Sequence, residues 1–268
     1  MDIVAAVLLL TDGYPLVKAL RANRTTTLRQ PLLWTLLAWS AWVGVAWGHV
    51  MRVGVGAQLA TYAALCLTGC AGIAVLGARR PGVSAWNFVV VGLLAVLFLP
   101  ILNGMGELRL ELAQELFLAV TLAVPLLNYL PTRLASGAIL AAAGCAWELV
   151  QLMGWVSVAR TPWLGLLLLA VAPWAAWAGV ASRRSTATAF DQLWLAYRDR
   201  FGFVWGQRMR EQFNRAAHHA GWPVVLRWGE LHSTADQLSP DPEQLLATLR
   251  AVLKRFGPEE QEQSSARR

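Results

Sequence analysis

The sequence predicts an all-α membrane protein: a six-helix transmembrane bundle with an N-terminal interfacial segment and a small, mainly helical cytoplasmic C-terminal unit. Hydrophobic residues make up 56% of the 268 positions and the mean hydropathy is +0.46, which is too apolar for an ordinary soluble domain. Long apolar runs recur through the first 181 residues, and a membrane-crossing helix needs about 20 such residues. Charge is concentrated after them, because 13 of the 23 basic residues lie between Ser182 and Arg268.

The composition argues against several classes of function but does not identify an activity. The net charge of +7 matches the excess of Lys and Arg that membrane proteins carry on their cytoplasmic side, so a nucleic-acid partner is not needed to explain it. The three Cys lie in apolar segments and form no disulfide framework. No phosphate-binding loop, nucleophile elbow, HExxH or paired CxxC motif occurs. We therefore expect no catalytic residues, no metal and no cofactor, and the preference for Arg over Lys is typical of a GC-rich bacterial genome.

Residues 1–31 are expected to lie on the membrane surface rather than across it. The apolar run from Met1 to Leu10 is too short to span and lacks the basic start and cleavage site of a signal peptide. Four basic residues follow it, at Lys18, Arg21, Arg24 and Arg29. This pattern is typical of an interfacial segment.

The transmembrane domain covers residues 32–181. Its six predicted spans are 32–50, 57–76, 85–102, 110–130, 134–154 and 162–181. The first is rich in Trp, which favours membrane–water boundaries, and contains Gly44-x-x-x-Gly48, a pattern that allows close helix packing. The fifth carries small residues that would let a neighbouring helix approach, namely Gly137, Ala141, Gly144 and Cys145. Residues 182–188 are expected to be a linker.

The distribution of Lys and Arg at the ends of these spans predicts the orientation. With the N terminus in the cytoplasm, nine basic residues fall on the inner side and only three, Arg52, Arg109 and Arg160, fall on the outer side. Because cytoplasmic loops carry the excess of Lys and Arg, this count predicts a multi-pass protein of the bacterial cytoplasmic membrane with both termini inside.

The least usual chemistry is a row of carboxylates at the start of the fourth span. Glu107, Glu111 and Glu115 recur every four residues, which places them on one helix face. On a helix, Glu115 lies roughly 7 Å into its span and Glu148 roughly 9 Å below the outer end of the next one, so their depths are similar. Together they suggest an outward-facing polar pocket for a cation, a proton or a lipid headgroup, formed by Glu107, Glu111, Glu115, Glu148, Gln151, Asn103, Arg109 and His49. The alternative is a solvated outer loop, with Glu115 and Glu148 close enough to the interface to reach water.

Residues 189–257 are expected to form the cytoplasmic helical domain, followed by a disordered tail at 258–268. One apolar stripe consists of Phe190, Trp194, Tyr197 and Phe201, and a second, rotated from the first, consists of Trp205, Met209, Phe213, Ala216 and Ala220. The change of face predicts a bend at Gly202–Gly206. Val224–His232 is expected to be extended, and Asp241-Pro242 is a typical helix start.

The run YRDRFGFVWGQRMREQFNRA, residues 197–216, resembles a segment of bacterial membrane proteins of the kind found in planctomycete-type genomes. The resemblance implies the same layout of membrane helices and tail, and it carries no known activity or site residues. The same region is basic, and its side chains are candidates for contact with anionic lipid: Arg198, Arg200, Arg208, Arg210 and Arg215.

Three function classes remain open. The favoured one is a non-enzymatic integral membrane protein whose cytoplasmic tail docks a protein partner or packs on the membrane surface. The second is a small transporter or permease-like protein that uses a pocket around Glu115 and Glu148. An intramembrane enzyme has the least support, because no nucleophile–base pair or metal-ligand set is visible in the sequence.

Overall fold

The structure is a computed structural model of the 268-residue chain and describes residues 2–52, 56–79, 83–103, 108, 110–155, 163–182, 188–233 and 241–256. Within these ranges the chain is helical except for one antiparallel hairpin of two short strands. The helices are α1 (Asp2–Thr11), α2 (Gly13–Ala22), α3 (Arg29–Val50), α4 (Ala57–Leu76), α5 (Val83–Leu97), α6 (Leu99–Asn103), α7 (Leu112–Tyr129), α8 (Ala135–Leu152), α9 (Leu164–Ala181), α10 (Ala189–His219), α11 (Pro242–Leu253) and the 3-10 turn η1 (Lys254–Phe256). The strands are β1 (Val224–Leu226) and β2 (Leu231–Ser233).

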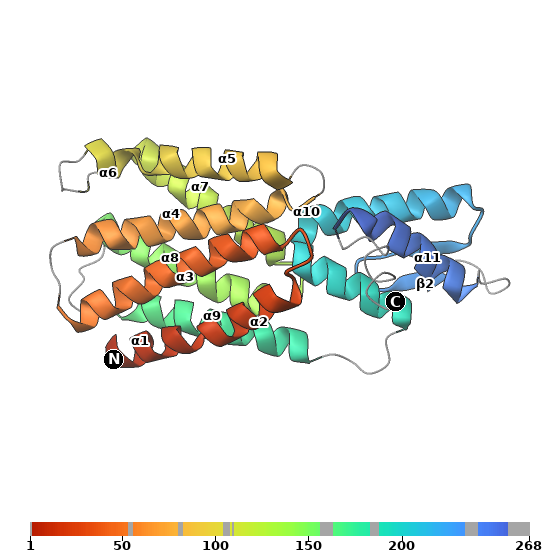
Figure 1. The fold of residues 1–268 in the computed structure, drawn as a ribbon, viewed down its shortest axis with the longest axis horizontal. Helices are drawn as coiled ribbons and strands as arrows, with labels where there is room; N and C mark the ends of the chain where they lie inside the picture. Colours follow the sequence, from red (N-terminus) through yellow and green to blue (C-terminus); the bar gives the residue numbers. More distant parts are fainter. Residues whose placement is uncertain are drawn as a thin grey trace, which may run out of the picture.

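The helices from α1 to α9 lie along one common axis, and α10, α11 and the hairpin gather beyond one end of that bundle (Figure 1). Among the described residues, five helical stretches are long and apolar enough to cross a membrane: Asp2–Ala22, Ala57–Leu76, Leu112–Tyr129, Ala135–Leu152 and Leu164–Ala181. This set indicates a membrane-embedded protein. The prediction of an all-helical bundle of apolar helices is therefore confirmed at this level, whereas the predicted number of six spans is not.

The N-terminal segment differs from the prediction. Helices α1 and α2 run in sequence along the bundle and pack against α3 and α9, with Ala5, Ala6 and Leu9 buried (Figure 1). The sequence reasoning considered only the continuous apolar run, but the helices join across a buried Asp12 and give a 21-residue apolar stretch. Among the described residues, Asp2–Ala22 is therefore a candidate span by length and composition, whereas residues 1–31 were expected to lie on the membrane surface; that placement stays a prediction. Helix α1 begins at the end of the bundle remote from α10 (Figure 1), and the cytoplasmic location of both termini stays a prediction.

Helix α3 is joined to three neighbouring helices by its tryptophans. The indole of Trp39 donates to the backbone oxygen of Leu9 at 2.7 Å, and that of Trp42 donates to Thr68 Oγ1 at 2.9 Å. Trp34 donates to Asn87 Oδ1 at 2.8 Å. A buried indole N–H needs a partner, and these bonds supply it from α1, α4 and α5. The Trp-rich sequence of α3 therefore reflects helix–helix bonding as well as preference for the membrane boundary.

Small residues allow helices α8 and α9 to pack closely. A methyl group added at Gly137 or Gly144 would overlap α9, so their backbones approach because side chains are absent. The packing role predicted for small residues in α8 is confirmed at these two positions. Gly44 and Gly48 differ, because nothing lies within 4 Å of the space their side chains would occupy. The GxxxG pattern of α3 is therefore not used for close packing among the described residues.

A second hydrophobic core lies beyond the end of the bundle. It contains the aromatic residues of both predicted stripes and extends to α11 and the hairpin. The predicted bend is confirmed at Gly202, where the backbone is non-helical inside α10. After it the buried alanine is Ala217 rather than the predicted Ala216 or Ala220. Asp241 caps α11 by accepting from the Glu243 N–H at 3.0 Å, as its sequence predicted. The predicted disordered tail, 258–268, lies outside the described residues.

Candidate functional site

The row of glutamates is explained in part by the start of α7. Glu111 is exposed and forms a capping box with Gln114, whose side-chain oxygen accepts from the Glu111 N–H at 3.0 Å. Glu115 lies in the first helical turn, where a carboxylate interacts favourably with the helix dipole. Both residues therefore have a local structural role. Glu107, Arg109 and the side chain of Asn103 lie outside the described residues.

Glu148 is the member of the predicted pocket that is truly buried. Its side chain is 4% exposed and fills the space beside Gly165 of α9, which has no side chain to block it. Its Oε1 has no hydrogen-bond partner, and neither does the amide nitrogen of Gln151. No hydrogen bond or ion pair joins Glu148 to Glu115 in the part of the chain that is described. His49, at the end of α3, is partly buried, and the convergence of Glu115 and Glu148 stays a prediction.

Asp12 is a buried carboxylate that the sequence reasoning missed. It separates α1 from α2 and is only 1% exposed. Neither of its oxygens meets the geometry of a hydrogen bond, although the side chain of Trp174 on α9 lies close to it. The signal was available, because a carboxylate in the middle of a 21-residue apolar stretch marks a position where charge is costly.

The densest set of polar contacts lies where α10 meets the end of the bundle, and we call this region the junction. At its centre Asn128 of α7 is 3% exposed and holds the kink in α10. Its Nδ2 donates to the Phe201 backbone oxygen at 3.4 Å, and its Oδ1 accepts from the Val204 N–H at 3.1 Å. Gly202 lies between these groups with φ 78° and ψ −165°, a conformation that is essentially restricted to glycine. A Cβ at Gly202 would overlap the Asn128 amide. The Asn128 side chain can therefore bond to the kinked backbone only because residue 202 is a glycine.

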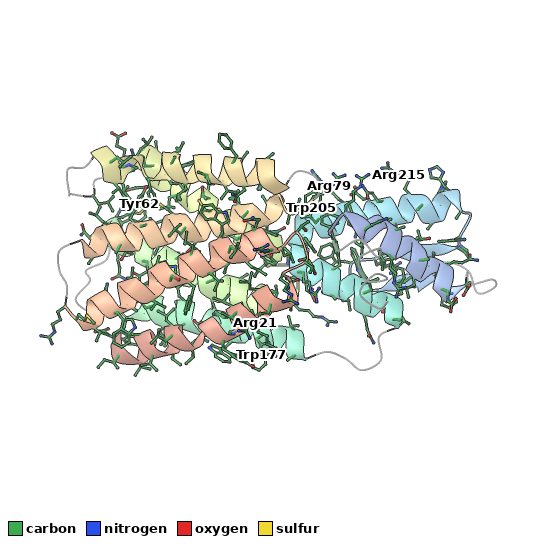
Figure 2. The ribbon with its side chains drawn as sticks, in the orientation of Figure 1. Arg21, Tyr62, Arg79, Trp177, Trp205 and Arg215 are labelled. Carbon is green, nitrogen blue, oxygen red and sulfur yellow. The ribbon has the colours of Figure 1, made fainter. Side chains whose placement is uncertain are left out.

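Further hydrogen bonds surround the contact between Asn128 and the kink at Gly202. The Trp205 indole donates to the backbone oxygen of Val75, at the end of α4, at 3.2 Å. The Tyr129 hydroxyl donates to the backbone oxygen of Arg200 at 3.0 Å. Figure 2 shows Arg79 and Trp205 together at the junction, and the Arg79 guanidinium lies 5.9 Å from the centroid of the Trp205 ring. The ends of α4 and α7 are therefore both bonded to α10.

The loops extend the junction. The Trp228 indole donates to the backbone oxygen of Pro131 at 2.6 Å. Thr27 Oγ1 donates to the backbone oxygen of Ala78 at 2.9 Å, and Phe256 lies close enough for its backbone oxygen to accept from the Thr27 N–H at 3.4 Å. The second core accordingly includes Leu28 and Ala78 from the bundle end. The C-terminal elements and the bundle thus share one continuous interior at this end.

Arg198 is not the lipid-facing residue that the sequence predicted. It is buried, and both its Nε and Nη2 donate to Asp199 Oδ1, at 3.0 and 2.7 Å. Its Nη1 donates to the Trp228 backbone oxygen at 2.9 Å. Asp199 also accepts from the Arg133 N–H at 3.3 Å, which connects this pair to the turn after α7. The prediction treats all five arginines alike as candidates for contact with lipid, but the partners of Arg198, Asp199 and the Trp228 backbone oxygen, hold it in the interior.

The other four arginines predicted to contact lipid are at least partly exposed. Arg200, Arg208 and Arg215 are exposed and Arg210 is partly exposed. The guanidinium of Arg208 lies 5.1 Å from the centroid of the Trp205 ring. Figure 2 shows Arg215 far along α10 from the junction. These four side chains give the exterior of α10 a positive charge, which we call the basic α10 surface.

Buried Tyr197 is the titratable group most strongly affected outside the membrane helices. Burial raises the pKa of its hydroxyl well above the usual range, and the nearby positive charge of Arg79 acts in the opposite direction. Its hydroxyl has no hydrogen-bond partner. The ring is packed against Phe201 and Phe256, with centroids 4.7 and 5.2 Å away. Tyr197 therefore acts as a core aromatic residue.

A metal site was not expected, and within the described ranges no group of three or more His, Cys, Asp or Glu side chains is arranged to hold one. His218 and His219 are exposed, and their rings stand 6.0 Å apart at 82°. No protein family, curated protein or solved structure matches the chain.

Proposed function

We propose that the protein is a non-enzymatic integral membrane protein of the bacterial cytoplasmic membrane, whose C-terminal unit (residues 188–256) is fixed on the cytoplasmic end of the bundle. The observation that carries this proposal is the fit of Asn128 to the kink at Gly202. If the C-terminal unit moved freely on its linker, the Asn128 side chain would have no need to match the backbone at Gly202. The unit then presents its basic α10 surface to an acidic protein partner or to anionic lipid from a constant position.

The proposed topology has seven passes. Helix pairs α1–α2 and α5–α6 each count as one pass, and α3, α4, α7, α8 and α9 supply the others. Basic residues gather at the end of the bundle that carries the junction, among them Lys18, Arg21, Arg79 and Arg133. Because the cytoplasmic side carries the excess of Lys and Arg, this supports a cytoplasmic C-terminal unit. Helix α1 then begins on the opposite side of the membrane.

Hydrogen exchange at single amides tests the fixed position of the unit. The Val204 N–H is bonded to a side chain of the bundle, so its protection reports docking rather than helix formation alone. In the full-length protein in lipid nanodiscs, we expect slow exchange at Val204. Asn128→Ala should accelerate this amide while leaving the interior of α4 protected. Leu127→Ala is the matched control, because the neighbouring side chain is exposed and should have no effect. Fast exchange at Val204 in the unmodified protein would contradict the proposal.

One specific observation supports the alternative of a transporter: the carboxyl group of Glu148 is buried, and its Oε1 has no hydrogen-bond partner. Ionisable groups inside a membrane are costly and commonly serve proton or ion pathways. In vesicles carrying an imposed proton gradient, the alternative predicts discharge by the unmodified protein and its loss in Glu148→Gln. Glu115→Gln should have the same effect only if both carboxylates belong to one pathway. An unmodified protein that leaves the gradient intact would rule out proton coupling.

A further inference from the structure

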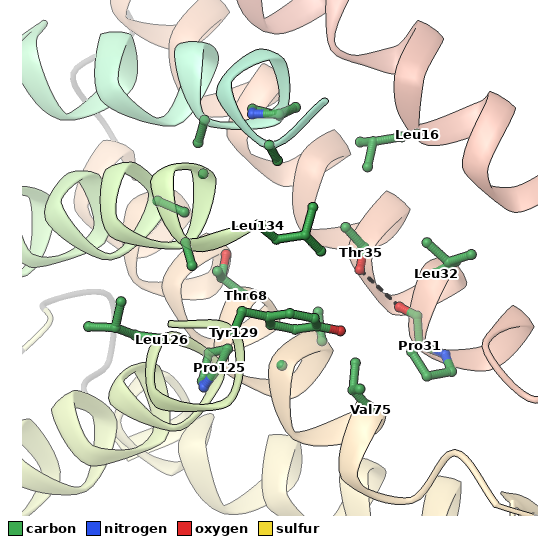
Figure 3. A pocket seen from close by; sticks show the side chains of 18 of the residues that line it. Leu16, Pro31, Leu32, Thr35, Thr68, Val75, Pro125, Leu126, Tyr129 and Leu134 are labelled. Carbon is green, nitrogen blue, oxygen red and sulfur yellow. Dashed lines mark hydrogen bonds between the residues drawn. The ribbon is translucent and has the colours of Figure 1, made fainter. Parts of the chain in front are cut away.

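A cavity of about 440 Å³ lies inside the bundle, in the half adjoining the junction. Its walls come from α2, α3, α4, α7, α8 and α9, and Arg200 of α10 lies at one end. Figure 3 shows the ring of Tyr129 reaching from α7 toward Pro31 of α3 and Val75 of α4. Sites for drug-sized ligands have volumes of about 300–1,000 Å³, so this space is large enough for a ligand of that size.

The cavity exists because the helices facing it carry little side-chain volume there. Helix α8 contributes Gly137, Ala138, Ala141 and Ala142 to its wall, and the other helices add further small or apolar residues. Pro125 in the interior of α7 and Pro173 in the interior of α9 also face it. Such a wall offers van der Waals contact and almost no hydrogen bonding. Its natural complement is a hydrocarbon chain.

The polar groups without a partner lie at the end next to the junction, whereas the threonine hydroxyls of the wall are satisfied. Thr35 and Thr68 have satisfied hydroxyls, because each donates to a backbone oxygen one turn earlier, at 3.0 and 2.7 Å. Asn23 differs: it is 7% exposed, and its Oδ1 has no hydrogen-bond partner. Arg200 adds a positive charge that makes no ion pair with any described residue. An unmet acceptor and a free cation at one end call for a head group that is anionic and also carries a hydroxyl donor.

We propose that this cavity binds one acyl chain of an anionic, hydroxylated phospholipid of the cytoplasmic leaflet, with its head group beside Asn23, Tyr129 and Arg200. Apolar walls take the chain, Arg200 attracts the phosphate, and a head-group hydroxyl donates to Asn23. Phosphatidylglycerol has this chemistry. Phosphatidylcholine with the same chains lacks both the net charge and the hydroxyl, so it is the matched comparison.

Native mass spectrometry of the delipidated full-length protein tests the proposal with dioleoyl phosphatidylglycerol and dioleoyl phosphatidylcholine as probes. We expect retention of phosphatidylglycerol in preference to phosphatidylcholine. Ala141→Phe fills the cavity and should abolish retention, whereas Ala143→Phe, on the exposed face of the same helix, should not. Arg200→Gln should weaken binding about five-fold. Equal retention of the two lipids, or full retention by a folded Ala141→Phe protein, would overturn the proposal.

Labelling of a native cysteine gives a second readout without any substitution. Cys145 contributes to the cavity wall, whereas the buried Cys66 and Cys70 do not. Added phosphatidylglycerol should slow the reaction of Cys145 with N-ethylmaleimide, measured peptide by peptide, and leave the other two thiols unchanged. A rate at Cys145 that is the same with and without the lipid would overturn the proposal even if Ala141→Phe fails to fold.

Discussion

Substituting Gly202 by alanine should release the C-terminal unit from the bundle. The methyl group added there should weaken docking more than a methyl group added at any other position. The native backbone there has φ 78° and ψ −165°, which costs a residue with a Cβ about 1–3 kcal/mol. The added methyl would also overlap the Asn128 amide and displace it from the Phe201 oxygen and the Val204 N–H. A buried group left without its partner costs about 1–3 kcal/mol. The two effects together predict a loss of about 2–6 kcal/mol.

Gly221→Ala is the matched control, because Gly221 also has a positive φ of 68° but nothing lies within 4 Å of its missing side chain. Backbone strain alone should cost about 1–2 kcal/mol there. Pulse proteolysis of the full-length protein over a urea series measures both changes, through the fraction of C-terminal unit that resists trypsin. In an Asn128→Ala background, Gly202→Ala should lose its additional cost, because the overlap is gone. Equal effects of Gly202→Ala and Gly221→Ala, or additivity with Asn128→Ala, would refute the reasoning.

Three further substitutions follow from burial and close contact. Asp199→Ala leaves Arg198 buried without its carboxylate and should cost about 3–5 kcal/mol in the same assay, so a change below 1 kcal/mol would show that the pair is solvated. Phe213→Ala removes a fully buried ring and should cost about 3–5 kcal/mol, measured by the urea midpoint; an unchanged midpoint would contradict its burial. Gly137→Leu should separate α8 from α9 and lower the thermal midpoint in detergent, whereas Gly48→Leu should leave it unchanged; similar shifts would contradict the packing.

The sequence was most informative where a local pattern determines a local structure. The bend at Gly202 and the start of α11 at Asp241 were predicted because each depends on only a few neighbouring residues. The aromatic stripes were predicted for the same reason, since helical periodicity gathers them on one face.

The failures involve contacts between distant segments. Asn128 gave no sequence signal, because its importance depends on Gly202, which lies 74 positions further along the chain. Arg198 could not be distinguished from its exposed neighbours, because it is buried against the backbone of Trp228, 30 positions further along the chain. For residues 2–22 the sequence analysis considered only the apolar run from Met1 to Leu10, whereas the structure continues past the buried Asp12 into a second helix and gives a 21-residue candidate span. The candidate pocket around Glu115 and Glu148 stays a prediction, because it was inferred from matched depth and depth does not determine the direction of a side chain.

The location of α1 relative to the C-terminal unit tests the central topological claim most directly. A single-cysteine reporter at Asp2 and another at His219 can be labelled in intact cells with a membrane-impermeant maleimide, after the three native cysteines are replaced by serine. The seven-pass account predicts labelling of the cysteine at position 2 in intact cells and of the one at position 219 only after the membrane is opened. Protection of both in intact cells would place the two segments on the same side and contradict the account.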